Sequence, residues 1–264
     1  MEPPKFPMTV KEFLEREDVL KRSDVMLARN TKALFSKLIM WGTQSMFSHA
    51  ALVFVTPFRE EGFNNTFIIE SVGDGVDITN LDYYLVDHSK EYDVGFKRLE
   101  SEWFAGKEGK KIRKAIRGRM LDFIKAKYDM GTIIDTALMI IRKFFFGMSV
   151  RMRGLPAAVE RVHEKKQLAP SQFICSGFVQ YGYFDEIQRL VAKGKLEPNR
   201  LEEVLFSPGL SPNMDPKQRT KLLLSTTPQD LAATDKLQWK YFIKKGMVHE
   251  VSSLKDIEAL IKKK

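Results

Sequence analysis

Two runs of strand-forming residues on either side of a turn-rich linker constrain the fold of this chain more than any other feature of its sequence. The runs are HAALVFV at 49–55 and TFIIES at 66–71, and strand formers dominate both. The linker, TPFREEGFNN, carries proline, glycine and two asparagines, which favour reversal of the chain. The pattern therefore predicts an antiparallel β-hairpin with a rather long loop.

This hairpin brings an imidazole and a carboxylate together. If Val55 lies opposite Asn64, the same register places His49 opposite Glu70, with both side chains on one face of the sheet. A carboxylate in that position orients a histidine ring and stabilises its protonated form. A solvated strand-edge histidine and a charged strand end are the simpler interpretations of each residue alone. Their coincidence at one register favours a functional pair.

The single cysteine of the chain, Cys175, lies in SQFICSGFVQYGYF at 171–184. Pro170 and Ser171 are expected to break and cap the chain before a helix, which places Cys175 in the first helical turn. A thiol there loses its proton more easily, because the helix dipole and the unpaired N–H groups favour the anion. The small residues Ser176 and Gly177 are expected to leave room for a substrate carbonyl. The alternative is a buried, inert cysteine.

The remaining pattern predicts an α+β fold in a single domain that covers residues 1–264. Strands grouped early in the chain, with helices on both sides, are typical of that class. Further strands are expected at 23–29, 92–99 and 237–243, and helices at 11–21, 31–44, 107–127 and from 225 to 234. Within the second of these helices, Leu34, Leu38 and Trp41 form one stripe. Within the third, Ile112, Ile116, Met120 and Phe123 or Ile124 face inward.

Charge and composition limit the partners of the protein. Lysine and arginine exceed aspartate and glutamate by 43 to 34, and nine of the basic residues lie in 107–127. Such a surface attracts polyanions such as anionic lipid, although a solvated helix face is the simpler interpretation. No nucleic-acid-binding motif accompanies it, so nucleic acid is not expected as a partner. Scattered histidines and one cysteine predict neither a metal site nor an internal disulfide, and no cofactor is expected.

The sequence also bears on location. The N-terminal stretch MEPPKFPMTVKEFLERED lacks the apolar core and cleavage site of a signal peptide, and no run is long and apolar enough to span a membrane. The expected location is therefore the cytoplasm, with peripheral membrane association as an addition to it.

Several short motifs resemble those of a known family. FSHAALVF, IIESVGDGV, the pair Tyr128–Asp129, FICSGFVQ and TPQDLA are similar, in this order and spacing, to the circularly permuted branch of the NlpC-type papain-like hydrolases, the YiiX-like enzymes. In that branch the histidine precedes the third polar residue and the cysteine, as it does here. SDVMLAR at 23–29 resembles the family's Gly-Asp strand, with Ser23 where glycine is usual. The likeness touches much of residues 23–243.

The resemblance implies a papain-like fold, in which a small antiparallel sheet packs on the cysteine-bearing helix. It implies that Cys175 is the nucleophile, His49 the base and Glu70 the residue that orients it. It places Tyr128 near the site as a substrate contact, although Tyr128 equally suits a core aromatic. The expected function is a cysteine-dependent amidase or peptidase that acts on a peptide or lipid-linked substrate through an acyl-enzyme.

Two alternatives stay open beside that function. One is a lipid acyltransferase or thioesterase of the same superfamily, and the other is a catalytically silent module that binds an anionic surface. The sequence departs from the family in the gap between Tyr128 and Cys175, where an apolar and basic helical insertion is expected at about 131–168. That insertion suits either a lid packed on the core or a cationic helix lying on an anionic membrane. The substrate and the oligomeric state are not determined by these patterns.

Overall fold

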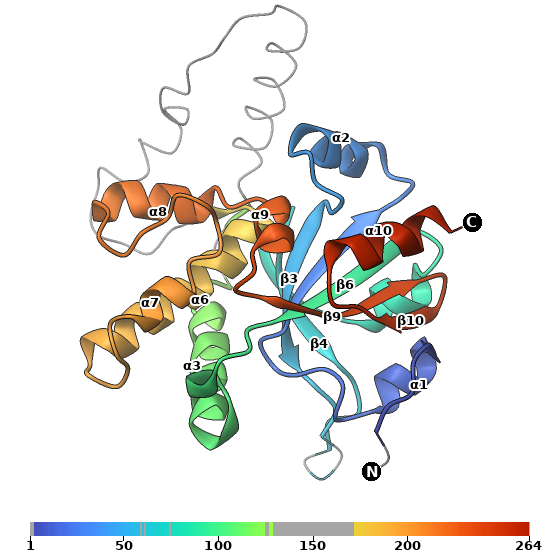
Figure 1. Ribbon diagram of the computed structural model, residues 1–264, viewed down its shortest axis with the longest axis horizontal. Coiled ribbons are helices and arrows are strands. Elements are labelled where there is room, and N and C mark those ends of the chain that lie inside the picture. Colours follow the sequence, from blue (N-terminus) through green and yellow to red (C-terminus); the bar gives the residue numbers. More distant parts are fainter. Residues whose placement is uncertain are drawn as a thin grey trace, which may run out of the picture.

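An eight-stranded antiparallel β-sheet lies at the centre of the protein (Figure 1). The computed structural model describes residues 3–58, 60, 62–73, 75–124, 127–128 and 172–263, and of residues 35, 42, 127, 128, 172 and 173 it describes the backbone alone. From one edge to the other, the strands are β1 (Met8–Thr9), β10 (Met247–Glu250), β9 (Gln238–Lys244), β6 (Tyr92–Arg98), β2 (Val25–Asn30), β3 (His49–Val55), β4 (Phe67–Val72) and β5 (Gly75–Asn80). The predicted α+β class is confirmed.

Helices cover both faces of this sheet. They are α1 (Val10–Glu15), α2 (Leu34–Gly42), the π-helix η2 (Tyr83–Asp87), the 3₁₀ turn η3 (Glu102–Phe104), α3 (Gly106–Leu121), α6 (Cys175–Ala192), α7 (Arg200–Glu203), α8 (Pro216–Leu224), α9 (Pro228–Ala233) and α10 (Leu254–Lys262). A separate pair of short parallel strands, β7 (Lys127–Tyr128) and β8 (Gln172–Phe173), leads into α6.

Each face of the sheet has its own hydrophobic core. On one face α6 packs against β3 and β4, and α3, α7 and α8 pack in turn against α6 (Figure 1). Side chains of α9 and α10 join the same core, as Leu231 and Ile257 show. On the other face, Phe13 of α1 and Leu85 of η2 pack with Met26 and Val53 of the sheet. The central strands are thus buried on both sides, which explains their nearly continuous apolar sequences.

The predicted hairpin is confirmed, but its predicted register is wrong. Glu70 pairs with Ala51 and not with His49, and a bulge between Val53 and Val55 shifts the rest of the ladder. The loop from 56 to 66 is not a simple turn. Within it, Phe58 and Phe63 form an isolated antiparallel β-bridge. Because the error amounts to two residues, an even number, His49 and Glu70 still point to the same face.

The basic segment forms an amphipathic helix, as predicted, although α3 ends at Leu121. Ile112, Ile116 and Met120 are buried along it, and Phe123 is buried just after it, whereas Ile124 is exposed. The predicted helix start near 225 is also confirmed, since Thr227 caps α9 in a capping box.

The late part of the chain contributes more to the sheet than the sequence pattern indicated. The predicted strand at 237–243 is β9, which pairs with β6 in the middle of the sheet. The unpredicted strand β10 and helix α10 follow it, and β1 completes that edge. Three side-chain hydrogen bonds from Lys97 of β6 reach the carbonyl oxygens of Leu231, Ala232 and Thr234, and so hold the end of α9 on the sheet.

The helical insertion predicted at 131–168 lies outside the described residues. Within the ranges that are described, no helix has both the length and the apolar character that crossing a bilayer requires.

Candidate active site

His49 and Glu70 meet where β3 begins. His49 is the first residue of β3 and pairs with Ala28 of β2, beyond the end of the ladder between β3 and β4. Glu70 lies diagonally across from it, on the same face of the sheet. The Nε2 atom of His49 is 2.5 Å from Oε2 of Glu70. Glu70 is almost fully buried, while 17% of the His49 side chain is exposed.

Two further side chains hold the carboxylate of Glu70. Thr79 of β5 donates its hydroxyl to Oε1 at 2.5 Å, and Tyr84 of η2 donates its hydroxyl to Oε2 at 2.7 Å. The Tyr84 ring also lies parallel to the His49 ring, 9° apart in plane with centroids at 6.2 Å. Burial alone would raise the pKa of Glu70, but hydrogen bonds from His49, Thr79 and Tyr84 and the charge on His49 lower it.

The sequence analysis missed Thr79 and Tyr84. A signal for the first was available, because the turn Gly73-Asp74-Gly75 is followed by the alternating segment VDITN, which is typical of a third strand. No local pattern could have shown that Tyr84 reaches Glu70, since the connecting segment forms a π-helix that turns the ring back over the sheet.

Cys175 is the first residue of α6, with Ile174 at the N-cap position. The prediction that Cys175 lies in a first helical turn is confirmed. The cap, however, is not Ser171, because the extended residues of β8 separate that position from the helix. Cys175 is buried, and its sulfur is hydrogen-bonded to the His49 ring. Since Nε2 faces Glu70, Nδ1 is the ring nitrogen left for the sulfur.

The electrostatic environment favours charge on both partners. Burial opposes ionisation of Cys175, yet the charge of His49, its hydrogen bond and the backbone N–H groups of Ala50 and Ser176 together lower the pKa of the thiol. Burial likewise opposes protonation of His49, but the nearby sulfur of Cys175 and the carboxylate of Glu70 raise the pKa of the imidazole well above its usual value. Both shifts act in the direction of a thiolate–imidazolium pair.

The small size of the residues after Cys175 does not itself open space for a substrate, contrary to expectation, because the side-chain positions of Ser176 and Gly177 face another segment of the chain. Ser176 is buried and donates its hydroxyl to the carbonyl oxygen of Thr226. A Cβ atom on Gly177 would lie 2.2 Å from the carbonyl oxygen of Leu224. Small residues are needed here because the end of α8 and the link from α8 to α9 pack directly on the first turn of α6.

Tyr128 lies in β7, which is described by its backbone alone. Tyr128 pairs with Phe173 of β8, two residues before Cys175, and β7 itself packs against β4 and β5. The backbone of Tyr128 therefore runs beside the segment that leads into α6. A contact between its side chain and a substrate stays a prediction.

No three His, Cys, Asp or Glu side chains gather as metal ligands within the described ranges. Two surface cavities lie elsewhere: one of about 320 Å³ beside Asp24 and Arg98, and one of about 750 Å³ between α1 and η2. Neither is lined by His49, Glu70 or Cys175, so the site rests on the hydrogen-bonded geometry of these three residues.

Comparison of the sequence with models of known protein families finds no match. Comparison with curated proteins likewise finds no similar chain.

Proposed function

We propose that this protein is a cysteine-dependent hydrolase that cleaves an amide or ester bond through an acyl-enzyme. One observation carries the proposal. The His49 imidazole is hydrogen-bonded to a buried carboxylate on one side and to the single cysteine, at the start of a helix, on the other. A nucleophile, a base and a group that orients the base are the parts that covalent acyl transfer requires.

In the first half of the reaction, the Cys175 thiolate attacks the carbonyl carbon of the substrate. The C=O electron pair moves to the oxygen, and backbone N–H groups in the first turn of α6 stabilise that oxyanion. When the tetrahedral intermediate collapses, the bond to the leaving nitrogen or oxygen breaks. The leaving atom takes the proton from the His49 imidazolium, and a thioester on Cys175 remains.

In the second half, His49 is neutral and acts as a base towards water. The water oxygen attacks the thioester carbonyl while His49 accepts its proton, and collapse of this second intermediate expels the Cys175 thiolate. The acid product leaves, and the thiolate–imidazolium pair is restored. Glu70 stays charged throughout, because Thr79 and Tyr84 donate hydrogen bonds to its carboxylate.

The proposed fold assignment is the papain-like one, in its permuted form. An antiparallel sheet that packs on a helix beginning with the nucleophile, and the chain order His49, Glu70, Cys175, both support it. The alternative of a silent module predicts an ordinary buried thiol. The charged surroundings of Cys175 favour the enzyme over that alternative.

The test is the pH dependence of alkylation, which needs no knowledge of the substrate. Because the chain has one cysteine, incorporation of iodoacetamide reports Cys175 directly. We expect the native protein to react nearly as fast at pH 6 as at pH 8. The alkylation rate of the unfolded protein should instead rise with pH, as it does for an ordinary thiol with a pKa of about 8.5. Identical profiles for the native and unfolded chains, or a native thiol that does not react, would exclude the proposal.

A panel of amide, ester and thioester substrates then identifies the reaction, with Cys175→Ala as the control. Turnover by the wild type that Cys175→Ala lacks supports the hydrolase. Transfer of the acyl group to an added amine or alcohol in preference to water would support the acyltransferase instead.

A further inference from the structure

Helix α2 exposes an apolar stripe that the sequence pattern alone would assign to a core. Leu34, Leu38 and Trp41 follow one another at helical spacing, yet they are 74%, 45% and 49% exposed. Solvent contact of this extent is unfavourable for large aliphatic side chains. Concentrated on one short helix, it is typical of a surface that meets a partner.

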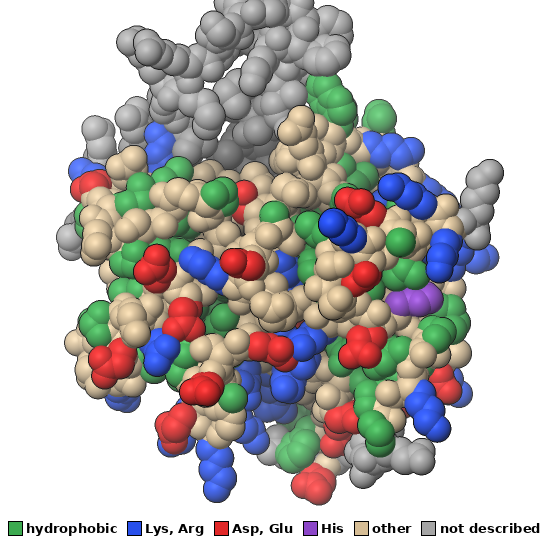
Figure 2. Space-filling model, in the orientation of Figure 1, with side chains coloured by type: hydrophobic (Ala, Val, Ile, Leu, Met, Phe, Trp, Pro, Cys, Tyr) green, Lys and Arg blue, Asp and Glu red, His purple; other side chains and the backbone are tan. Residues whose placement is uncertain are grey.

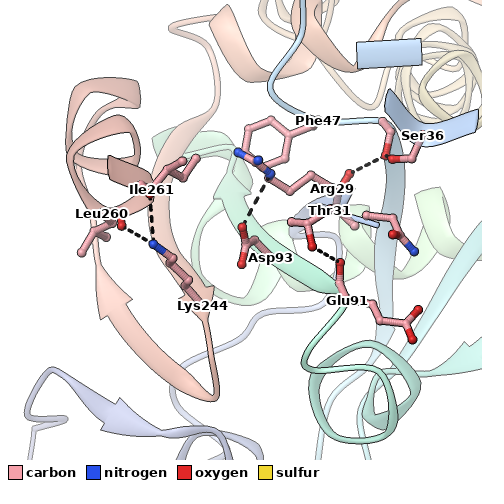
Figure 3. A network of polar contacts seen from close by, with 12 residues as sticks. Arg29, Thr31, Ser36, Phe47, Glu91, Asp93, Lys244, Leu260 and Ile261 are labelled. Carbon is pink, nitrogen blue, oxygen red and sulfur yellow. Dashed lines mark hydrogen bonds and ion pairs between the residues drawn. The ribbon is translucent and has the colours of Figure 1, made fainter. Parts of the chain in front are cut away.

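The opposite side of α2 is tied to the body of the protein. The buried hydroxyl of Ser36 donates to the hydroxyl of Ser48, the residue directly before His49, at 2.5 Å (Figure 3). Before the helix, the side chain of Asn30 accepts hydrogen bonds from the backbone N–H groups of Lys32 and Ala33. These bonds fix α2 beside the start of β3, so that its apolar stripe points away from the sheet.

The charged residues of α2 and of the segments that flank it in sequence all have one sign. Lys32 and Lys37 are exposed next to it, and no aspartate or glutamate occurs between Asp24 and Glu60. Figure 2 shows hydrophobic side chains at the upper edge of the molecule, over α2, with Lys and Arg side chains beside them. A second copy of this chain would bring like charges together at such a surface, whereas an anionic surface would complement it.

We propose that α2 docks the protein on an anionic lipid bilayer. Leu34 and Leu38 enter the boundary between headgroups and acyl chains, with Trp41 at the headgroup level, while Lys32 and Lys37 pair with lipid phosphate or carboxylate groups. This inference goes beyond the proposed hydrolase and does not depend on it. If both hold, the site at His49 lies close to the membrane surface, because six residues separate it from the end of α2.

The test is co-sedimentation with vesicles of phosphatidylcholine, with and without 30% phosphatidylserine. Wild-type protein should sediment with the anionic vesicles, and less so as salt rises, because exposed charges are screened within about 10 Å at 0.1 M ionic strength. The double variant Leu34→Gln/Leu38→Gln should bind at least about tenfold more weakly. Val86→Gln, at a valine that is 52% exposed on η2 and not on α2, is the matched control and should bind as the wild type does.

Three results would overturn the inference: no sedimentation with anionic vesicles, equal binding by the double variant, or a halving of the solution mass in that variant, which would make the stripe a dimer contact. Circular dichroism checks that the variants are folded. The Cys175→Ala variant should bind vesicles like the wild type, and the double variant should keep the wild-type alkylation rate without vesicles. Failure of membrane docking and failure of the proposed hydrolase are therefore distinguishable.

Discussion

Two clusters of buried charge lie on the same sheet, and they differ in what their charges can do. One is the triad of His49, Glu70 and Cys175 at the start of β3. The other joins Arg98 of β6 to Asp24, just before β2, by two hydrogen bonds of 2.7 and 2.6 Å. Both clusters are mostly shielded from water, so burial of charge alone does not distinguish a catalytic group from a structural one.

The two clusters differ in whether their charged groups can exchange a proton. The Arg98 guanidinium keeps its proton at any ordinary pH and donates a further bond to the carbonyl oxygen of Val19, while Asp24 also accepts the backbone N–H of Lys21. The guanidinium therefore has no proton to pass on to another group. In the triad, Cys175 and His49 are both titratable groups, and the proposed reaction passes the proton of His49 to the leaving group of a substrate. Asp24 lies in the segment 23–29, which resembles the Gly-Asp strand of the family named above. Here its carboxylate is held by Arg98.

The largest effect is expected from breaking the ion pair of Arg98 and Asp24. Arg98→Ala leaves Asp24 buried without its counter-charge, so the free energy of unfolding should fall by about 3–5 kcal/mol, measured by urea denaturation. The exposed pair of Arg16 and Asp18 has a similar two-bond geometry, so Arg16→Ala is the matched control and should change stability far less. A comparable loss in both variants would contradict the role given to burial.

The next effect is on reactivity and not on stability. In His49→Ala, the Cys175 thiol loses its cationic partner while burial still raises its pKa, so its alkylation at pH 6 should fall roughly thirtyfold or more. Glu70→Gln should reduce the rate less, because the imidazole remains but loses the carboxylate that raises its pKa. Melting temperatures close to that of the wild type are expected in both. A large drop in melting temperature with unchanged alkylation would make this cluster structural as well.

A smaller effect is expected at the residues that hold the carboxylate. Tyr84→Phe and Thr79→Val each remove one hydrogen bond to Glu70, which raises the pKa of that carboxyl. The acid limb of the alkylation profile should then move to higher pH, with a rate at pH 6 lower by about two- to fivefold. Tyr83→Phe, at a neighbouring ring whose hydroxyl is not bonded to Glu70, is the control. An unchanged alkylation profile in both variants would show that these two hydrogen bonds to Glu70 do not influence the reactivity of Cys175.

The smaller of the two effects on stability concerns the residue that directs Asp24 towards Arg98. Ser23 has a positive φ of 73°, a conformation that glycine adopts more easily. Its hydroxyl bonds to the carbonyl oxygen of Arg113 at 3.3 Å. Both Ser23→Gly and Ser23→Ala remove that bond, so their difference isolates the backbone. The glycine variant should be more stable than the alanine variant by about 1 kcal/mol in thermal unfolding, and equal stability would contradict this.

Local patterns were sufficient for much of the fold and for the three residues of the triad. The hairpin follows from strand formers around a turn. The shared face of His49 and Glu70 follows from the two-residue period of a strand, so it was predicted correctly although the register was wrong by two residues. The position of Cys175 at a helix start was predicted from the apolar residues that follow it, although the predicted cap at Ser171 was wrong. In each case the interaction that decides the structure joins residues close in sequence.

Only the tertiary structure decided the rest, because the deciding contacts join distant segments. The bulge in β3 and the bridge inside its loop set the register. The first turn of α6 is tightly packed because Leu224 at the end of α8 and Thr226 in the link to α9 lie against Gly177 and Ser176. Helix α2 has the apolar stripe of a core helix, yet Leu34 is exposed. Helical period determines which side chains share a face, whereas burial of that face depends on what other segments of the chain cover it.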